Sequence, residues 1–182
     1  MDRHEFARKY EAAFGRLWLI AAGAIGDRSA ADDIVQESAI IAYKKLHSFC
    51  DGTNFEAWAS QIVRYCAANH KRKSKGRNTH PIDPATLDLQ PQDSNSPELV
   101  RSGGEIELEA AFDDEMLRGL SQLTGEARTC LLLRVVDELS YTDIASLTGI
   151  PASTAMSHVH RSKIKLRQTI QDEHGEKAVP ND

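Results

Sequence analysis

The side chains that most readily suggest chemistry in this sequence are the acidic groups between residues 32 and 37. Asp32, Asp33 and Glu37 fall in a segment with helical periodicity. Paired carboxylates can act as general acid and base or hold a divalent cation. The same residues near a helix start also complement the helix dipole without any further function. No nucleophile, glycine-rich loop or ligand cluster lies near them in the sequence, so we favour a protein-contact surface over catalysis.

A second pair, Cys66 and His70, lies one helical turn apart and has a spacing that metal ligands use. Cys50 and Cys130 lie far away in the sequence, and no second pair completes four ligands, so we expect no metal and no cofactor. Three cysteines without a framework spacing favour a reduced, cytoplasmic protein. The N-terminus is too charged for a signal peptide, and the longest apolar run, 17–25, is too short for membrane insertion.

Positive charge is concentrated in this chain rather than spread along it. The 182 residues carry a net charge of −5, which does not fit a protein that coats nucleic acid along its whole length. Six cations and no acidic residue occur between Arg64 and Asn78. This run adjoins Trp58 and Tyr65, whose rings can stack on unpaired bases, as is typical of a surface that follows a nucleic-acid backbone. Cations at a helix C-terminus also occur without any ligand.

The stretch 140–167 predicts two helices joined by a tight turn. Thr142 is the expected N-cap of the first helix, and Gly149 stands where a left-handed residue often ends one. Pro151 suits the start of the second helix, which runs towards Ile170. This is the build of a helix-turn-helix whose second helix can enter a DNA major groove. An ordinary helical hairpin with a solvated basic end is the alternative.

The remaining segments that must position these groups are also predicted to be helical. Apolar residues recur at three- and four-residue steps from residue 3 to 25, and again after a near capping box at 29–32. A third helix starts near Asn54, and Thr124 is the expected N-cap of a later one. Periodicity is absent from 74–104, where four prolines indicate a linker. The sequence predicts an all-α protein with these parts: residues 1–76, a linker 77–104, a second domain 105–173 and a disordered tail 174–182.

Two stretches together resemble a known family. Residues 30–37, AADDIVQE, followed by FEAW at 55–58 and the basic run, resemble region 2 of bacterial RNA polymerase sigma factors. Residues 120–128 and 140–167 resemble their region 4. With only these regions and a short linker, the chain is similar to an extracytoplasmic-function (ECF) sigma factor. The resemblance implies two small helical domains, a region 2 bundle and a region 4 helix-turn-helix, in a cytoplasmic protein that is not an enzyme.

The resemblance also implies three binding surfaces. The family's acidic helix docks on the clamp coiled coil of core RNA polymerase, and the corresponding residues here are Asp32, Asp33, Val35, Gln36, Glu37 and Ile40. The residues that correspond to those melting and reading the minus-ten promoter element are Asn54, Trp58, Gln61, Arg64, Tyr65, Asn69, Lys71, Arg72 and Lys73. The residues expected to read the minus-thirty-five element are Ser153, Thr154, Ser157, His158, His160, Arg161 and Lys165.

The partners that follow from this resemblance are core RNA polymerase and promoter DNA, and an anti-sigma factor commonly joins them in the family. Some residues depart from the family pattern. Met156 and His158 flank Ser157 where a cation and an arginine are common, which lowers the positive charge on the recognition helix. The departure predicts weaker affinity for the upstream element or an unusual sequence of that element.

A stand-alone helix-turn-helix transcriptional regulator is the second hypothesis. It would use only the C-terminal half and would have no need of the acidic helix at 32–37 or of the basic helix that carries Trp58. A phosphotransfer or hydrolytic enzyme is the third, and no motif in the sequence supports it. The hypothesis that the chain is a sigma factor accounts for both of its halves.

Overall fold

The computed structural model describes residues 1–74, 76, 87, 89 and 114–176, and helices are the only regular secondary structure in this part. The helices of the first half are α1 (Arg3–Ile25), α2 (Arg28–Lys44), the short 3₁₀ helix η1 (Leu46–Ser48) and α3 (Phe55–Ser74). Those of the second half are α4 (Asp114–Ser121), α5 (Gly125–Val135), α6 (Tyr141–Thr148) and α7 (Ala152–Glu176). The all-α prediction is confirmed.

Parts of the predicted organisation lie outside the described residues. They include the linker at 77–104 apart from Leu87 and Leu89, the start of the second domain expected at residue 105, and the last six residues. Helix α7 continues to Glu176, three residues into the segment that we predicted to be a disordered tail. None of the described helices is both long and apolar enough to span a bilayer.

The ends of the first helices follow from capping residues. The Asp2 carboxylate accepts a hydrogen bond from the first turn of α1, and Gly26, with φ of 81°, ends that helix. Helix α2 begins earlier than expected, because the Asp27 carboxylate accepts a hydrogen bond of 2.9 Å from the Ala30 amide. Asp27 therefore caps α2, and the capping box predicted at 29–32 is wrong.

In the second half, the predicted cap of α5 is observed, whereas α6 is capped by a different residue from the predicted one. The Thr124 hydroxyl accepts a hydrogen bond of 3.3 Å from the Ala127 amide at the start of α5. At α6 the cap is Ser140, whose hydroxyl accepts a hydrogen bond of 3.1 Å from the Asp143 amide. The prediction of Thr142 is wrong, because Thr142 lies within the first turn. The C-cap of α6, Gly149, has φ of 72°, as expected.

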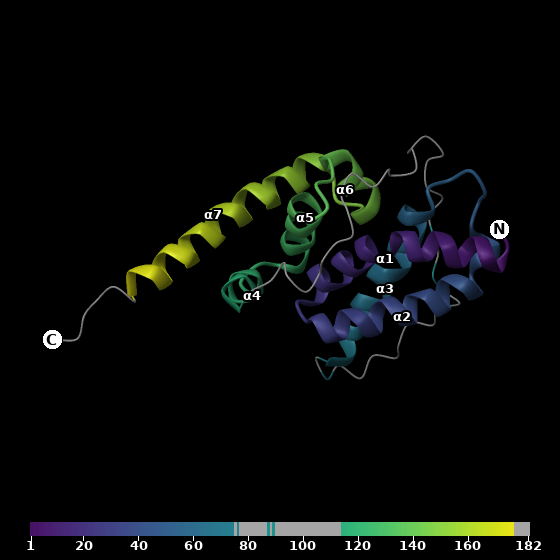
Figure 1. Ribbon diagram of the computed structural model, residues 1–182, viewed down its shortest axis with the longest axis horizontal. Helices are drawn as coiled ribbons and strands as arrows, with labels where there is room; N and C mark the ends of the chain where they lie inside the picture. Colours follow the sequence, from purple (N-terminus) through teal and green to yellow (C-terminus); the bar gives the residue numbers. More distant parts are fainter. Residues whose placement is uncertain (75, 77–86, 88, 90–113, 177–182) are drawn as a thin grey trace.

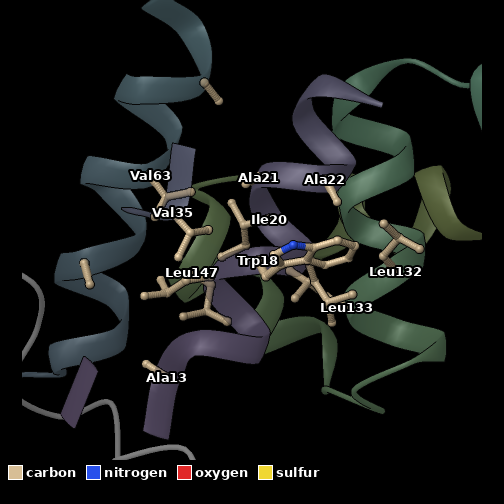
Figure 2. Packing of buried hydrophobic residues seen from close by; sticks show 14 of the residues in the cluster. Ala13, Trp18, Ile20, Ala21, Ala22, Val35, Val63, Leu132, Leu133 and Leu147 are labelled. Carbon is tan, nitrogen blue, oxygen red and sulfur yellow. The ribbon is translucent and has the colours of Figure 1, made fainter. Parts of the chain in front are cut away.

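Helix α1 lies at the centre of the molecule, with α2 and α3 against it on one side and α5 on the other (Figure 1). Its residues from Gly15 to Gly23 are all buried. Figure 2 shows the indole of Trp18 beside Leu132 and Leu133 of α5. The halves predicted as two small domains therefore lie in contact and share one hydrophobic core.

The helix-turn-helix is attached to this core through two of its helices. Helix α6 packs against α3, and α5 packs against α7. The C-terminal part of α7 projects away from the body of the molecule (Figure 1). The N-terminal part of α7, which carries the predicted recognition residues, is consequently held on a rigid base.

Candidate functional site

Helix α2 presents an acidic strip to solvent. The side chains of Asp33, Gln36 and Glu37 are exposed, and Ile40 continues the strip with 58% of its surface exposed. Tyr43, one turn beyond Ile40, is also exposed. Sequence reasoning missed Tyr43, although its three-residue spacing from Ile40 was a usable signal. The strip combines negative charge with an apolar end, as a protein-binding helix would.

Two of the residues predicted for the polymerase-binding surface of this helix also have structural roles. The Val35 side chain is completely buried, and its carbonyl accepts a hydrogen bond of 2.9 Å from the Tyr10 hydroxyl. Val35 therefore holds α2 in place from inside, and its side chain offers nothing to a partner. The Asp32 carboxylate is exposed, yet it accepts a hydrogen bond of 2.6 Å from the Trp18 indole. That bond fixes the N-terminal turn of the strip to α1.

The aromatic residues before and within α3 pack on one another. Trp58 is buried, with its ring centroid 5.3 Å from Phe49 and 5.6 Å from Phe55. Asn54 is also buried, and its side-chain oxygen accepts a hydrogen bond of 3.0 Å from the Ala57 amide, which caps α3. The suggestion that Trp58 offers a ring face to unstacked bases is wrong for this arrangement of the chain, because other aromatic rings cover it.

The polar edge of α3 is half-buried along most of its length. This holds for Gln61, Arg64, Tyr65, Asn69, Lys71 and Arg72, whereas Lys73 at the end of the run is exposed. Arg72 donates a hydrogen bond to Asn69. The structure thus brings the minus-ten candidates together on one helix, with their charge concentrated towards its C-terminus.

Arg64 is a half-buried cation of this edge. Its guanidinium lies beside Gly149, in the turn of the helix-turn-helix. Burial lowers the pKa of Arg64, and no carboxylate of the described residues pairs with it. A cavity of about 430 Å³ opens here between α3 and the second half of the chain, and Arg64, Lys71 and Thr148 contribute to its wall. Part of the candidate DNA surface therefore faces the other half of the protein.

The face of α7 predicted to enter DNA is accessible. Ser153, Thr154, His160, Arg161 and Lys165 are exposed, and Ser157 and His158 are half-buried. The opposite side of the helix is anchored by Ala155 and Val159, which are buried with Ile144 and Leu147 of α6 in the core. All seven residues predicted to read the upstream element therefore lie on one element, which α6 supports from behind.

Two of these side chains also contact the rest of the second half. The Lys165 ammonium donates a hydrogen bond of 2.8 Å to the Gln122 carbonyl. The His158 Nε2 lies 3.8 Å from the Glu126 carboxylate, an ion pair only when the imidazole is protonated. Met156, the departure noted in the sequence, is exposed beside them and leaves this part of the helix less cationic.

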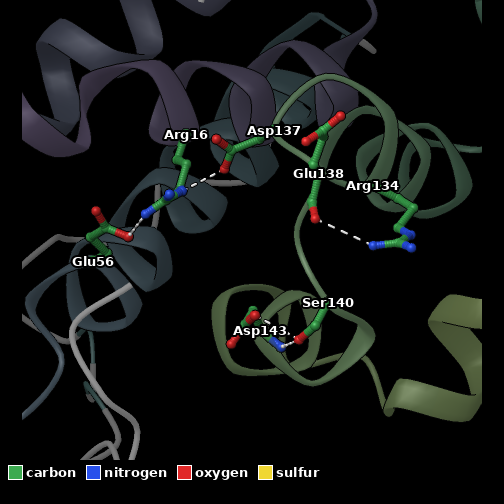
Figure 3. Close-up of polar contacts among 7 residues, drawn as sticks. All are labelled: Arg16, Glu56, Arg134, Asp137, Glu138, Ser140 and Asp143. Carbon is green, nitrogen blue, oxygen red and sulfur yellow. Dashed lines mark hydrogen bonds and ion pairs between the residues drawn. The ribbon is translucent and has the colours of Figure 1, made fainter. Parts of the chain in front are cut away.

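A buried ionic cluster, which sequence reasoning missed, joins the two halves (Figure 3). Arg16 of α1 is only 4% exposed, and its guanidinium donates to Glu56 at 2.6 Å and to Asp137 at 2.5 Å. Burial alone would lower the pKa of Arg16, but attraction to Glu56 and the hydrogen bond to Asp137 outweigh it and raise that pKa. The signal in the sequence was an arginine within an otherwise apolar helix segment, without any indication of its partners.

The described helices carry acidic and basic faces in separate places. Among the residues that the structure covers, no three histidine, cysteine or acidic side chains come together as metal ligands. The acidic strip of α2, the cationic edge of α3 and the polar face of α7 are borne by different helices. Such a molecule is suited to binding one protein and two stretches of nucleic acid.

Two family models match the chain. The Sigma-70 region 2 model matches residues 10–77, and the Sigma-70, region 4 model matches residues 113–166. The ECF RNA polymerase sigma factor SigW of Bacillus subtilis is 25% identical over 175 residues, covering 94% of this chain and 91% of that protein. The ECF RNA polymerase sigma factor EcfG of Rhodopseudomonas palustris is 29% identical over 174 residues, covering 94% and 88%.

A solved structure is similar as well. It is that of the sigma factor RpoE from Bartonella quintana, in complex with the anti-sigma factor NepR. The TM-score is 0.63, with 23% sequence identity over 92% of this chain and 97% of that chain. At this identity the likeness concerns the fold, and it covers both halves of the molecule.

Proposed function

Because this chain belongs to the ECF group of bacterial RNA polymerase sigma factors, and so directs promoter-specific initiation of transcription, we propose which of its surfaces meet polymerase and which meet DNA. Region 2 corresponds to α1 to α3 and region 4 to α4 to α7. The observation that supports the assignment most directly is the separation of charge among α2, α3 and α7. The chain itself carries out no chemistry under this proposal, and it acts in the cytoplasm, where polymerase works.

Helix α2 docks on the clamp of core RNA polymerase. The exposed Asp33, Gln36 and Glu37 supply polar contacts, and Ile40 and Tyr43 supply the apolar part of the interface. Asp32 contributes while bonded to Trp18, and Val35 supports the helix from below. Interfaces of this kind combine a few apolar anchors with charged groups that guide association.

The edge of α3 binds the minus-ten element. Arg64, Lys71, Arg72 and Lys73 neutralise phosphates, and Gln61, Tyr65 and Asn69 face the strand that is opened. Asn54 and Trp58 act indirectly, because they fix the loop before α3 and its first turn. Their substitution would disturb this region by loosening its fold.

Helix α7 enters the major groove of the minus-thirty-five element. Ser153, Thr154 and Ser157 are small enough for close approach to base edges, and Arg161 and Lys165 lie further along, where phosphates run. His158 and His160 complete this face. The exposed Met156 takes the place of a charge, so base contacts carry a larger share of the affinity for this element.

Reconstitution with core bacterial RNA polymerase tests this assignment. The full chain should bind the core enzyme in a pull-down and produce specific transcripts from genomic DNA fragments. Asp33→Ala combined with Gln36→Ala should weaken polymerase binding at least tenfold, because both side chains are exposed on the docking face. A matched control is Glu11→Ala with Gln168→Ala, which removes one exposed acid and one exposed amide on other helices.

Three outcomes distinguish the possibilities. Unchanged polymerase binding by the α2 double variant, with helicity retained, would move the docking surface off α2. Equal loss in the control pair would mean that general charge, rather than the α2 strip, drives the association. DNA binding without any association with polymerase would instead favour the stand-alone regulator.

A further inference from the structure

The cavity beside Arg64 is large enough and open enough to admit a small molecule. Its volume of about 430 Å³ lies within the range of about 300–1,000 Å³ that small-molecule sites occupy. Helix α3 contributes one part of its wall, and α1, the start of α5 and the end of α6 contribute most of the rest. Ala68 of α3 lies on this wall and is exposed, so the cavity can be entered from solvent. A molecule bound there would touch both halves of the chain.

Much of the cavity wall is apolar. Ile20 and Ala67 are buried there, and Ile150 is half-buried beside them. The hydroxyls of Thr129 and Thr148 are already engaged, because they donate hydrogen bonds of 2.9 Å and 2.6 Å to backbone carbonyls of their own helices. A water molecule needs about two to four polar partners to be held in such a space. A compact apolar or aromatic group would instead gain contacts with these side chains.

Two cations of α3 border the same cavity. Arg64 and Lys71 are about two helical turns apart, so they lie on one face of α3. A Cβ on residue 149 would lie 3.1 Å from the Arg64 Nη1, and one on residue 125 would lie 3.0 Å from the Lys71 Nζ. Arg64 therefore reaches the end of α6, and Lys71 reaches the start of α5. Both side chains extend from α3 towards the second half and place positive charge at the cavity wall.

The positive charge of this wall is only partly compensated. Glu126 is the acidic residue among those that line the cavity, and its carboxylate is 73% exposed and lies 3.8 Å from the His158 Nε2. The Arg64 guanidinium pairs with no carboxylate of the described residues, and burial lowers its pKa. The C-terminal end of α6 offsets about half a unit charge. Because burying an uncompensated cation is unfavourable, an anion in the cavity would be stabilised.

Phosphate fits this pair of cations better than carboxylate does. An arginine presents a fork of donors that matches two phosphate oxygens, and a lysine binds phosphate as a point charge. A phosphate monoester carries a charge of about −1.5 to −2 near pH 7, which is close to the sum of the two cations. Helix α5 begins at Gly125 in the same wall, so the positive end of its dipole adds to the attraction.

We propose that this cavity binds a small organic phosphate, with the phosphoryl group between Arg64 and Lys71 and a compact apolar or aromatic part against Ile20 and Ala67. The site goes beyond the function proposed above and does not depend on it. Arg64 and Lys71 also belong to the surface proposed for the minus-ten element, so a bound phosphate occupies cations that the promoter would use. Only this consequence rests on the proposed function.

Titration of the full chain with phenyl phosphate tests the proposal. Isothermal calorimetry would measure the affinity, and inorganic phosphate and phenol would be titrated separately as the two parts of the probe. Phenyl phosphate should bind at one site per chain and about tenfold or more tightly than either part, because it uses both the cations and the apolar wall. In amide NMR spectra of the labelled chain, the largest shifts should occur at Gly125 and Gly149, which lie beside the two cations.

Ala68→Glu tests the placement of the phosphoryl group, and Ala7→Glu is the matched control. Residue 68 is exposed and follows Arg64 by one helical turn and precedes Lys71 by another, so a carboxylate there pairs with both cations. This variant should bind phenyl phosphate about tenfold or more weakly than the parent. The control makes the same change at an exposed alanine of α1 away from the cavity and should match the parent. Arg64→Gln should weaken binding as well, and it keeps the test decisive if Ala68→Glu loses helicity.

Three results would overturn the proposal. They are the absence of saturable binding, an equal affinity for inorganic phosphate and phenyl phosphate, or an unchanged affinity in both Ala68→Glu and Arg64→Gln. Equal loss in Ala7→Glu would also count against it, because general charge rather than the cavity would then determine binding. These titrations contain neither polymerase nor DNA. Failure of the ligand site therefore leaves the proposed function standing, and failure of that function leaves the ligand site standing.

Discussion

Replacing Ser140 with Ala should destabilise region 4 through the loss of a single cap. The Ser140 hydroxyl accepts a hydrogen bond of 3.1 Å from the Asp143 amide and lies 2.6 Å from the Asp143 carboxylate. Loss of a serine N-cap costs about 1 kcal/mol, within a range of roughly 0.5–2 kcal/mol. The carboxylate that loses its partner adds little to this, because the group is solvated.

Thr142→Ala is the matched control, and its expected effect has the opposite sign. Thr142 is exposed within the first turn of α6, and no described group depends on its hydroxyl for a cap. Alanine exceeds threonine in helix propensity by up to about 0.7 kcal/mol. The two variants should therefore differ by roughly 1–2 kcal/mol in the free energy of unfolding, with Ser140→Ala the less stable.

Urea unfolding followed by far-UV circular dichroism would measure this difference, with amide hydrogen exchange to localise it. For a chain of this size, 1 kcal/mol corresponds to about 2–4 °C in Tm. Exchange should accelerate first in the amides of α6, because the uncapped turn frays from its N-terminus. If both variants unfold at the same urea concentration, Ser140 does not cap α6. If Thr142→Ala is the weaker one, the helix begins where the sequence pattern had placed it.

Three further predictions concern DNA, thiols and pH. Arg161→Ala should lower affinity for the upstream element and reduce the slope of log K against log salt by about 1, and an unaltered slope in a filter-binding titration would move Arg161 off the phosphates. In the folded chain a thiol reagent should modify Cys50 alone, because Cys66 and Cys130 are buried. Burial also raises the pKa of Cys66 to about 12 and that of Cys130 to about 11. Fast modification of all three cysteines without denaturant would contradict this prediction. Burial also raises the pKa of Tyr10 to about 12, although the hydrogen bond with Ser38 acts to lower it. Between about pH 10 and pH 12 the unfolded phenol is ionised and the folded one is not. The free energy of unfolding should therefore fall as the pH rises through this range. Urea titrations at pH 8 and pH 11 would measure that fall, and Tyr10→Phe should reduce it.

The sequence predicted helices far better than it predicted their first residues. Periodic apolar positions do not depend on tertiary contacts, so α1, α3, α5 and α7 were recognisable from them. At α2 and again at α6, the observed cap lies two residues before the predicted one, and both residues are of a type that can cap a helix. Packing decides between them: burial of Ile144 and Leu147 fixes the phase of α6, and that phase places Ser140 at its start. Local propensity carries no information on that choice.

The candidate site was predictable where a residue's role depends on its own helix. The recognition face of α7 is an example, since helical geometry alone puts its residues together. Val35 and Trp58 show the limit, because a family motif does not distinguish a side chain that binds from one that supports the binding surface. The Arg16–Asp137 bond lay beyond reach altogether, since it joins residues 121 positions apart through a loop whose conformation is set by Arg134.

One feature of α1 in the sequence did indicate that the two halves lie in contact. A helix that is apolar on all faces must be covered on all faces, and the residues from Gly15 to Gly23 form such a stretch. Helices α2 and α3 pack on one side of α1, and the apolar neighbours on its other side come from α5. Helix α5 packs on the side of α1 that carries Trp18 and Ala22. The burial of this apolar surface between α1 and α5 favours the contact between the two halves.

Trp18 connects the contact between α1 and α5 to α2, the helix proposed to dock on polymerase. Its ring lies beside Leu132 of α5, and its indole N–H donates to Asp32 at the start of the acidic strip. Asp32 therefore enters the proposed interface with this hydrogen bond in place. The packing of α5 on α1 and the position of Asp32 in the acidic strip therefore depend on the same side chain.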